Sequence, residues 1–331
     1  CARQRAAALA DRLEPFGVNV TLLVGGMKAK EKRIALAAIA DGRANLVVGT
    51  HAVLTDTVEF KNLGLAIVDE QQPVLKDLRD VYDMPIPDPM SSGRLSVWLE
   101  ATERLVEAIG DHVFVMGRAD QGPFSIACLL RGTTQFMMDL LTEDPKLIAD
   151  VLDYCRRISA VFAKAQKDAG AHATSIGDAF AGPNLISPDM YRQFAFEPER
   201  KLVEEVQDYG IPFSVHICGD TTGIIGDMGR TGARILEVDW KLDMAEARRL
   251  VPESTVLMGN IDPSFPLVVG TPDDVDAAVK NLVAKTRGRR HIISSGCAMG
   301  RNTPEANFRA FITAARRYGS YEELCRLNEN L

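Results

Sequence analysis

The stretch SVHICGD, residues Ser214–Asp220, places an imidazole and a thiol two residues apart at the end of a short apolar run. Side chains at positions i and i+2 of an extended chain point to the same side, so His216 and Cys218 are expected to face one spot. These two groups make half of a zinc site, and a complete site needs at least one further soft ligand. Cys297 is the candidate, because the sequence SSGC places it just past the buried-strand pattern His291–Ser295.

The rest of the chain alternates apolar, β-branched runs with helical patterns, which is typical of a parallel α/β architecture. In a (β/α)8 barrel the C-terminal ends of the strands converge on one face, so the three side chains are expected to meet there. We therefore predict an α/β, TIM-barrel-like fold. The predicted strands are Val18–Val24, Asn45–Gly49, Gly64–Asp69, His112–Gly117, Ala173–Gly177, Phe213–His216, Arg234–Val238, Thr255–Gly259 and His291–Ser295. The predicted helices are Lys28–Asp41, Leu95–Ile109, Thr133–Leu141, Pro145–Ala169, Pro188–Tyr209, Thr221–Thr231, Met244–Leu250, Pro272–Thr286 and Thr303–Tyr318.

Length and composition narrow the class of protein. A chain of 331 residues is within the range of one α/β barrel. The net charge of -7 argues against a general nucleic-acid binder, which needs a basic surface. No apolar run approaches the roughly 20 residues of a membrane span. The six cysteines are scattered without a disulfide framework, which favours a reduced, cytoplasmic protein, and Cys128 and Cys155 lie in helical patterns as expected core residues.

Residues 1–72 resemble part of the motor domain of the RecG family of branched-DNA helicases. The stretches that carry the resemblance are ARQRAAALADRLEPFGVNVTLLVGGMKAKEKRIALAAIADG and NLVVGTHAVLTDTVEFKNLGLAIVDEQ. The resemblance implies that Asp69 and Glu70 occupy a Walker B motif. A phosphate-binding GxxxxGK[ST] loop occurs nowhere in the chain, so helicase or ATPase activity is not expected. This segment is predicted to be a structural or fused remnant.

Residues 73–331 resemble the uroporphyrinogen decarboxylase superfamily, and within it the methylcobamide:coenzyme M methyltransferase branch. The stretches that carry the resemblance are MPIPDP, GRADQGPFSIA, DAFAGPNLISPDMYRQF, IPFSVHICGDTT, MGNIDP and IISSGCAMGRNTPEANFRAF. The resemblance implies a (β/α)8 barrel in which His216, Cys218 and Cys297 bind Zn²⁺ and leave one position open. It also implies a methyl donor, either methylcobalamin or a partner corrinoid protein, and an acceptor that is a small thiol such as coenzyme M.

Other polar residues follow predicted strands and are candidates for the same face. Asp178 follows SIG and is a candidate catalytic residue, while Asn260 and Asp239 are candidates for substrate binding. Arg118 and Gln121 are expected in a loop over this face, where they would bind an anion such as a sulfonate or carboxylate. The alternative is that these side chains orient His216, cap the following helices or brace the loop.

Three alternatives to the methyltransferase reading stay open at this point. They are a decarboxylase of the same superfamily, although its arginine-rich N-terminal signature is missing here, an inactive fusion, and a DNA-dependent motor. The barrel itself is in question, because only six predicted strands follow from His112 onward and a barrel of this class has eight. Our hypothesis is that Asn45–Gly49 and Gly64–Asp69 complete a hybrid barrel. An incomplete barrel would expose strand edges and favour aggregation or a homo-oligomer.

Overall fold

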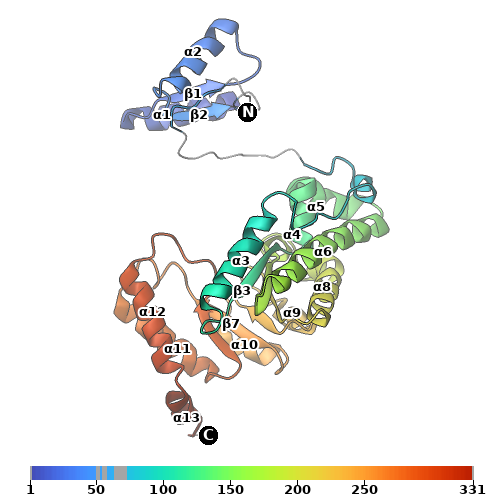
Figure 1. Cartoon of the computed structure of the whole chain (residues 1–331), viewed down its shortest axis with the longest axis vertical. Coiled ribbons are helices and arrows are strands. Elements are labelled where there is room, and N and C mark those ends of the chain that lie inside the picture. Colours follow the sequence, from blue (N-terminus) through green and yellow to red (C-terminus); the bar gives the residue numbers. More distant parts are fainter. Residues whose placement is uncertain (1, 50–52, 54–57, 63–72, 330–331) are drawn as a thin grey trace. The chain divides into compact units, whose positions relative to one another are not determined.

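The computed structural model describes residues 2–49, 53, 58–62 and 73–329 of the chain. The chain folds as two compact units, Cys1–Gln71 and Gln72–Leu331, which are described separately (Figure 1). Within the described residues, no helix combines the length and apolar character that crossing a membrane requires.

The first unit holds a two-stranded parallel sheet. Its elements are α1 (Ala2–Leu13), η1 (Glu14–Phe16), β1 (Val20–Leu23), α2 (Ala29–Ala40) and β2 (Leu46–Gly49). Strand β1 pairs with β2 in the register Val20↔Leu46, and a small core gathers Leu23, Ala35 and Ile39.

This pairing corrects one expectation. The predicted strand Asn45–Gly49 exists as β2, but it pairs with β1 in its own sheet and does not extend the larger sheet of the second unit. The hypothesis that it completes a hybrid barrel is therefore wrong. The other proposed contributor, Gly64–Asp69, lies outside the described residues.

The second unit is built on a parallel sheet whose strands follow one another in chain order, β3-β4-β5-β6-β7-β8. This order, without any reversal, is the winding of a (β/α)8 barrel, and the described residues supply six strands of it. The strands are β3 (Met116–Gln121), β4 (Ala173–Gly177), β5 (Phe213–His216), β6 (Ile235–Glu237), β7 (Val256–Ile261) and β8 (His291–Ser295). The main helices are α3 (Leu95–Ile109), α4 (Pro123–Arg131), α5 (Thr133–Thr142), α6 (Pro145–Asp168), α8 (Phe196–Asp208), α9 (Ile225–Arg230), α10 (Met244–Leu250), α11 (Pro272–Thr286), α12 (Glu305–Tyr318) and α13 (Tyr321–Glu329).

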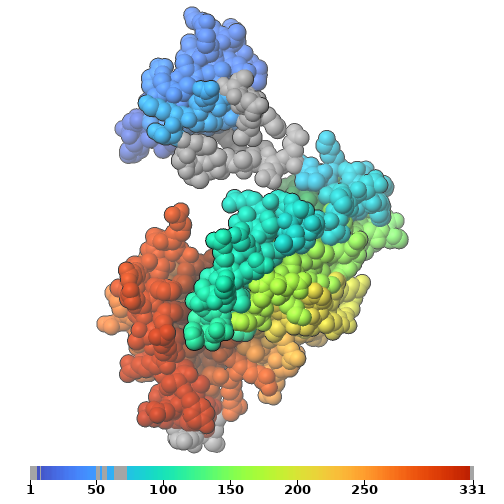
Figure 2. Space-filling model, viewed as in Figure 1, coloured from blue at the N-terminus to red at the C-terminus, as the bar shows by residue number. Residues whose placement is uncertain are grey.

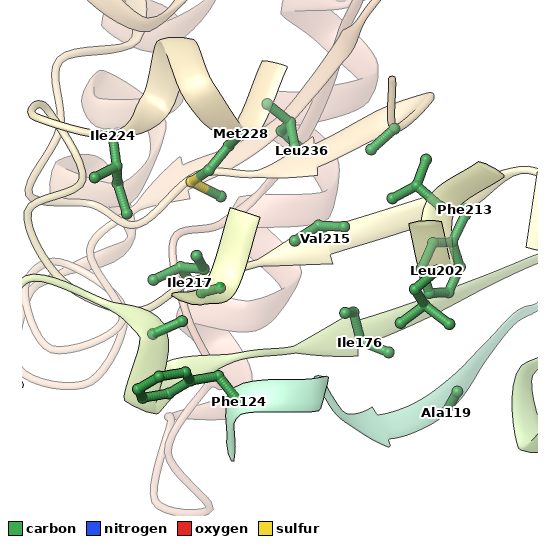
Figure 3. Close-up of a cluster of buried hydrophobic side chains, with 14 of the residues drawn as sticks. Ala119, Phe124, Ile176, Leu202, Phe213, Val215, Ile217, Ile224, Met228 and Leu236 are labelled. Carbon is green, nitrogen blue, oxygen red and sulfur yellow. The ribbon is translucent and has the colours of Figure 1, made fainter. Parts of the chain in front are cut away.

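The sheet has an apolar face and a polar face. Ile176, Val215 and Leu236 point into a core that also contains Leu202 of α8 and Met228 of α9 (Figure 3). Because side chains alternate along a strand, the residues between them point to the opposite face. On β4 and β5 these intervening residues are Ser175, Ser214 and His216. The alternation of large apolar and small polar residues thus places His216 away from the helix-covered core.

Strand β3 begins four residues later than the sequence predicts. Val113 and Phe114, which read as part of a buried strand, are 50% and 63% exposed, and the strand itself starts at Met116. Arg118 and Gln121 were expected in a loop and instead lie on the strand.

The segment that follows the predicted boundary between residues 72 and 73 belongs to the second unit. Leu75, Leu78 and Val81 are buried in its main core, and the short helix η3 (Leu78–Tyr82) starts with a capping box formed by Asp77 and Asp80. Residues 75–82 therefore pack on the core of the sheet domain.

Helix α3 lies at the surface of the second unit (Figure 2) and packs against α6. Its outer side exposes several large apolar side chains, namely Val97, Trp98, Leu105 and Ile109. Clustered apolar side chains at a surface are a common feature of interaction sites, and a homo-oligomer stays a prediction.

Candidate metal centre

The ends of strands β5 and β8 bring one imidazole and two thiols together. The Nε2 atom of His216 lies 3.1 Å from Sγ of Cys218 and 3.9 Å from Sγ of Cys297, and the two sulfurs are 3.9 Å apart. His216 is the last residue of β5, and Cys297 follows β8 by two residues. Among the described residues, these three form the cluster of His, Cys, Asp and Glu side chains that is suited to a metal ion.

The orientation of the imidazole is set by strand β6. The Nδ1 atom of His216 lies 3.0 Å from the backbone carbonyl oxygen of Glu237. A carbonyl can only accept, so Nδ1 carries the proton and donates it, and Nε2 is left to face the two thiols. Holding the second ring nitrogen in this way fixes the tautomer that binds a metal through Nε2.

The imidazole of His216 and the thiol of Cys297 change one another's acidity. Burial acts against a charged His216, but hydrogen bonds to Cys218 and Cys297 outweigh it and raise the pKa of His216 to about 10. The same contact with His216 is the main cause that lowers the pKa of the Cys297 thiol. The contact therefore favours the thiolate of Cys297, the form of cysteine that binds metals.

The donor atoms have the spacing that a tetrahedral zinc ion requires. Zn–S bonds of about 2.3 Å and Zn–N bonds of about 2.0 Å at tetrahedral angles separate two sulfurs by roughly 3.8 Å and a sulfur from a nitrogen by roughly 3.5 Å. The observed distance between the two sulfurs is 3.9 Å, and the two distances from nitrogen to sulfur, 3.1 and 3.9 Å, lie on either side of the second value. Two thiolates and one imidazole also match the soft, borderline character of Zn²⁺. The residues present fit zinc, with a fourth position left for another ligand.

Arg118 reaches across the polar face of the sheet next to the cluster. Its Nη1 atom lies 3.7 Å from the carboxylate of Glu237 and 3.4 Å from the hydroxyl of Ser175. A Cβ atom at Gly177 would come within 2.4 Å of Nη2, so the guanidinium lies directly over this glycine, whose register partner on β5 is His216. The side chain of Arg118 is 38% exposed, which leaves donors available to a bound anion.

Asp178 lies just beyond β4, but its carboxylate faces a helix. One oxygen accepts from the backbone N–H of Phe124 at 3.1 Å and the other from Ser125 at 2.7 Å, so Asp178 caps the N-terminus of α4. The residue is fully buried, and burial raises the pKa of Asp178 to about 6. Its backbone N–H donates to the carbonyl of His216 at 2.8 Å, which links this cap to β5. A catalytic role for Asp178 stays a prediction.

The three remaining candidates are used in local hydrogen bonds. Asn260 donates its side-chain N–H to the carbonyls of Asp239 and Leu242, at 3.0 and 2.6 Å. Asp239 is buried and accepts from two backbone N–H groups. Gln121 donates to the neighbouring Asp120 at 3.2 Å. The contacts of Asn260 and Asp239 brace loops, and that of Gln121 stays within β3. Substrate binding by Asn260, Asp239 and Gln121 stays a prediction.

Sequence reasoning missed two acidic residues. Glu237 contacts His216 through its carbonyl, while its carboxylate accepts from the hydroxyl of Ser214 at 2.9 Å. Glu199 is buried on α8, accepts from the hydroxyl of Tyr191 at 2.6 Å, and its other oxygen has no hydrogen-bond partner among the described residues. The available signal for Glu237 was a charged residue inside the apolar run ILEV.

Comparison with known proteins agrees with this fold and site. The uroporphyrinogen decarboxylase (URO-D) family matches residues 55–318. A methylcobamide:CoM methyltransferase, MtbA, of Methanosarcina mazei is 31% identical over 283 residues, which cover 82% of this chain and 81% of that protein. A uroporphyrinogen decarboxylase of Prochlorococcus marinus is 30% identical and covers 76% of this chain and 72% of its own length.

A solved structure extends the likeness to three dimensions. A methyltransferase from Methanosarcina mazei superimposes with a TM-score of 0.69 at 28% sequence identity, covering 79% of this chain and 74% of that one. The family match begins at residue 55, inside the range that resembles a helicase motor, and the resemblance of residues 1–72 to helicases stays a prediction. From the parallel sheet, the matched range and the level of identity, the chain belongs to the uroporphyrinogen decarboxylase family.

Proposed function

We propose that this chain transfers a methyl group from a methylated corrinoid to a small thiol, with zinc held by His216, Cys218 and Cys297. The observation that carries the proposal is the meeting of these three donors at the strand ends, with Nδ1 of His216 held by Glu237 and Nε2 facing the two thiols. The similarity to a methylcobamide:CoM methyltransferase supports the choice of donor and acceptor.

Each residue of the centre has a separate task in this proposal. Zinc bound there would act as a Lewis acid that lowers the pKa of an added thiol, so that a nucleophilic thiolate is available at neutral pH. Cys218 and Cys297 supply thiolate ligands, and His216 supplies Nε2 while Glu237 holds its other nitrogen. Two thiolate ligands would donate electron density to the ion, which would preserve the nucleophilicity of the acceptor.

Arg118 is the residue that we assign to the acceptor. Its guanidinium lies on the same face of the sheet as His216, and Glu237 at 3.7 Å holds it only loosely. A thiol that carries a sulfonate or carboxylate, such as coenzyme M, would place its anionic group on this guanidinium while its sulfur faces the metal centre. The methyl donor would be a partner corrinoid protein or free methylcobalamin.

A decarboxylase is the alternative within the family, because decarboxylase relatives are as similar as 30%. Its substrate presents several carboxylates, which call for a group of cations, and the arginine-rich signature of that branch is missing here. The pair of thiols beside an imidazole has no part in that chemistry and favours the methyltransferase.

The direct test is a methyl-transfer assay with the purified chain. Methylcobalamin is mixed with coenzyme M, and its loss of methyl is followed by absorbance and by mass spectrometry of the methylated thiol. We expect zinc-dependent turnover that Cys297→Ser abolishes, and that Cys325→Ser, a thiol on α13, leaves unchanged. Formation of the methylated thiol at equal rates in the wild type and Cys297→Ser would overturn the proposal.

A further inference from the structure

One short segment supplies no metal ligand, yet it contacts each of the three donors or the residue next to it. It is the end of β6 and the three residues after it, 237–240. The carbonyl of Glu237 accepts from His216, the carboxylate of Asp239 accepts from the N–H next to Cys218, and the backbone of Trp240 abuts the residue before Cys297. This segment thus lies where it can set the relative positions of the three donors.

Asp239 is the member of this segment whose side chain links two loops by hydrogen bonds. It is only 4% exposed, and its two carboxylate oxygens accept from the N–H groups of Gly219 at 2.9 Å and Lys241 at 3.0 Å. Its backbone carbonyl accepts from Asn260 at 3.0 Å. The carboxylate therefore joins the loop after β5 to the loop after β6, and both oxygens are occupied by protein.

The Gly219 N–H belongs to the peptide group that follows Cys218. Fixing that group fixes the backbone on the C-terminal side of the Cys218 Cα, and with it the direction of the Cβ–Sγ bonds. Gly219 has a φ of +96°, a conformation that side-chain-bearing residues rarely adopt, so the chain turns sharply away just after the thiol. The hydrogen bond that the Gly219 N–H donates to Asp239 holds this turn in place.

The same segment limits the position of Cys297. A Cβ atom at Gly296 would lie 2.4 Å from the backbone nitrogen of Trp240, so the loop after β8 passes against the loop after β6 without room for a side chain. Since Asp239 also ties the N–H of Lys241, the backbone on both sides of Trp240 is held. The positions of Cys218 and Cys297 therefore both depend on the segment 237–240.

We propose that Asp239 is a positioning residue for the metal centre, which acts through the Gly219 peptide on Cys218 and through the Trp240 backbone on Cys297. This inference rests on the proposed function for the identity of the metal. Residues that orient metal ligands typically change metal affinity by about 10- to 100-fold when they are replaced. Asp239 would thus strengthen metal binding without itself being a ligand.

The test compares Asp239→Ala and Asp239→Asn with Asp243→Asn. Asp243 is a matched control, because its carboxylate also accepts from two backbone N–H groups, Ala245 and Glu246, but at the start of α10. Zinc affinity is measured by competition with a chromophoric chelator, and cobalt(II) is substituted so that sulfur-to-cobalt absorption reports the ligand geometry. Thermal unfolding monitored by circular dichroism identifies variants that fold.

We expect Asp239→Ala to bind zinc 10- to 100-fold more weakly, with a weakened and shifted cobalt–sulfur band. Asp239→Asn keeps one acceptor oxygen and should fall between the alanine variant and the wild type, and it carries the test where the alanine variant does not fold. Asp243→Asn should bind like the wild type. Wild-type affinity and an unchanged cobalt spectrum in both Asp239 variants would overturn the inference.

A second readout separates this inference from the proposed function. In metal-free protein, iodoacetamide labelling of Cys218 is followed by mass spectrometry. Loss of the Asp239 contact should free the turn at Gly219 and raise the labelling rate of Cys218 several-fold. A wild type without zinc affinity would refute the proposed function, whereas an unchanged labelling rate in the Asp239 variants would refute the positioning role.

Discussion

The Nδ1 atom of His216 lies 3.0 Å from the backbone carbonyl of Glu237, on the neighbouring strand of the parallel sheet. This single contact decides which nitrogen of the imidazole is available to a metal. Because a backbone carbonyl cannot be altered by a change of side chain, the tautomer is secured by the register His216↔Glu237 of the sheet itself. The centre is thus a property of the fold as much as of its three donor residues.

The first prediction concerns the anion contact of Arg118. Arg118→Gln should raise the KM for coenzyme M about 10- to 100-fold, since a hydrogen bond to a charged group contributes roughly 1.5–3 kcal/mol. The KM for 2-mercaptoethanol, which has no anionic group, should change little. Steady-state kinetics with both thiols check this, with Arg104→Gln on the exposed side of α3 as the control. Equal losses for both thiols would argue against an anion site.

The second prediction asks whether the carboxylate of Asp178 stabilises the fold or takes part in the reaction. Asp178→Ala removes the acceptor of two buried N–H groups of α4, so the free energy of unfolding should fall by about 1–3 kcal/mol. Asp144→Ala, which removes the exposed cap of α6, should cost less because water replaces the lost acceptor. Urea denaturation measures both. A stable Asp178→Ala variant that has lost methyl transfer would instead assign this carboxyl to the reaction.

Glu199 should make the fold less stable as the pH rises. Burial and the charge of Asp178 raise the pKa of Glu199 well above its ordinary value, so its contribution to stability is present in acid and is lost as the pH rises through the folded-state pKa. Glu199→Gln keeps an acceptor for Tyr191 and cannot ionise, so this loss should disappear.

The measurement is the free energy of unfolding in urea at pH 5 and pH 8. Glu204→Gln, an exposed residue on the same helix, is the control. The same pH dependence in Glu199→Gln and the wild type would contradict the account.

His291 should have the opposite pH dependence. Burial lowers its pKa, while Nε2 donates to the carbonyl of Gly259 at 2.7 Å. Stability is therefore full above the unfolded-state pKa of about 6.5 and is lost as the pH falls through the folded-state value, by at most about 1.4 kcal/mol per pH unit. Unfolding at pH 7.5 and 5.5 should show a smaller loss in His291→Gln than in the wild type. A matching loss in both proteins would refute this assignment, and His112→Gln serves as the exposed control.

The sequence predicts well those elements whose two faces differ in a simple way. Strands Ala173–Gly177, Phe213–His216 and His291–Ser295 and helices Leu95–Ile109 and Pro272–Thr286 have the predicted bounds. The i, i+2 spacing of His216 and Cys218 and the place of Cys297 after a strand brought all three donors to one spot. For these residues, the local periodicity of the sequence and the chain order of the strands predict the same position at the strand ends.

The differences have physical causes. Strand β3 was placed too early because its own inner face is polar and carries Arg118, while the apolar run before it lies exposed. The single helix predicted over Pro188–Tyr209 is interrupted by a π-helical turn, η5 (Tyr191–Ala195). Pro198 explains the interruption, because it offers no N–H to the carbonyl four residues earlier.

The supporting contacts of the centre could not be read from the sequence. Asp239 follows β6 and Asn260 is the penultimate residue of β7, places typical of ligand-binding residues, yet their side chains hydrogen-bond to neighbouring loops. Whether a polar residue at a strand end faces a substrate or a backbone depends on loop paths, which no periodicity encodes.

The metal content of the purified chain tests the central claim most directly. Inductively coupled plasma mass spectrometry of the wild type, Cys297→Ser and Cys325→Ser measures zinc per polypeptide after removal of loosely bound ions. We predict about one zinc per chain in the wild type and in Cys325→Ser, and almost none in Cys297→Ser. A wild type free of zinc, or a Cys297→Ser variant that keeps its full complement, would contradict the account.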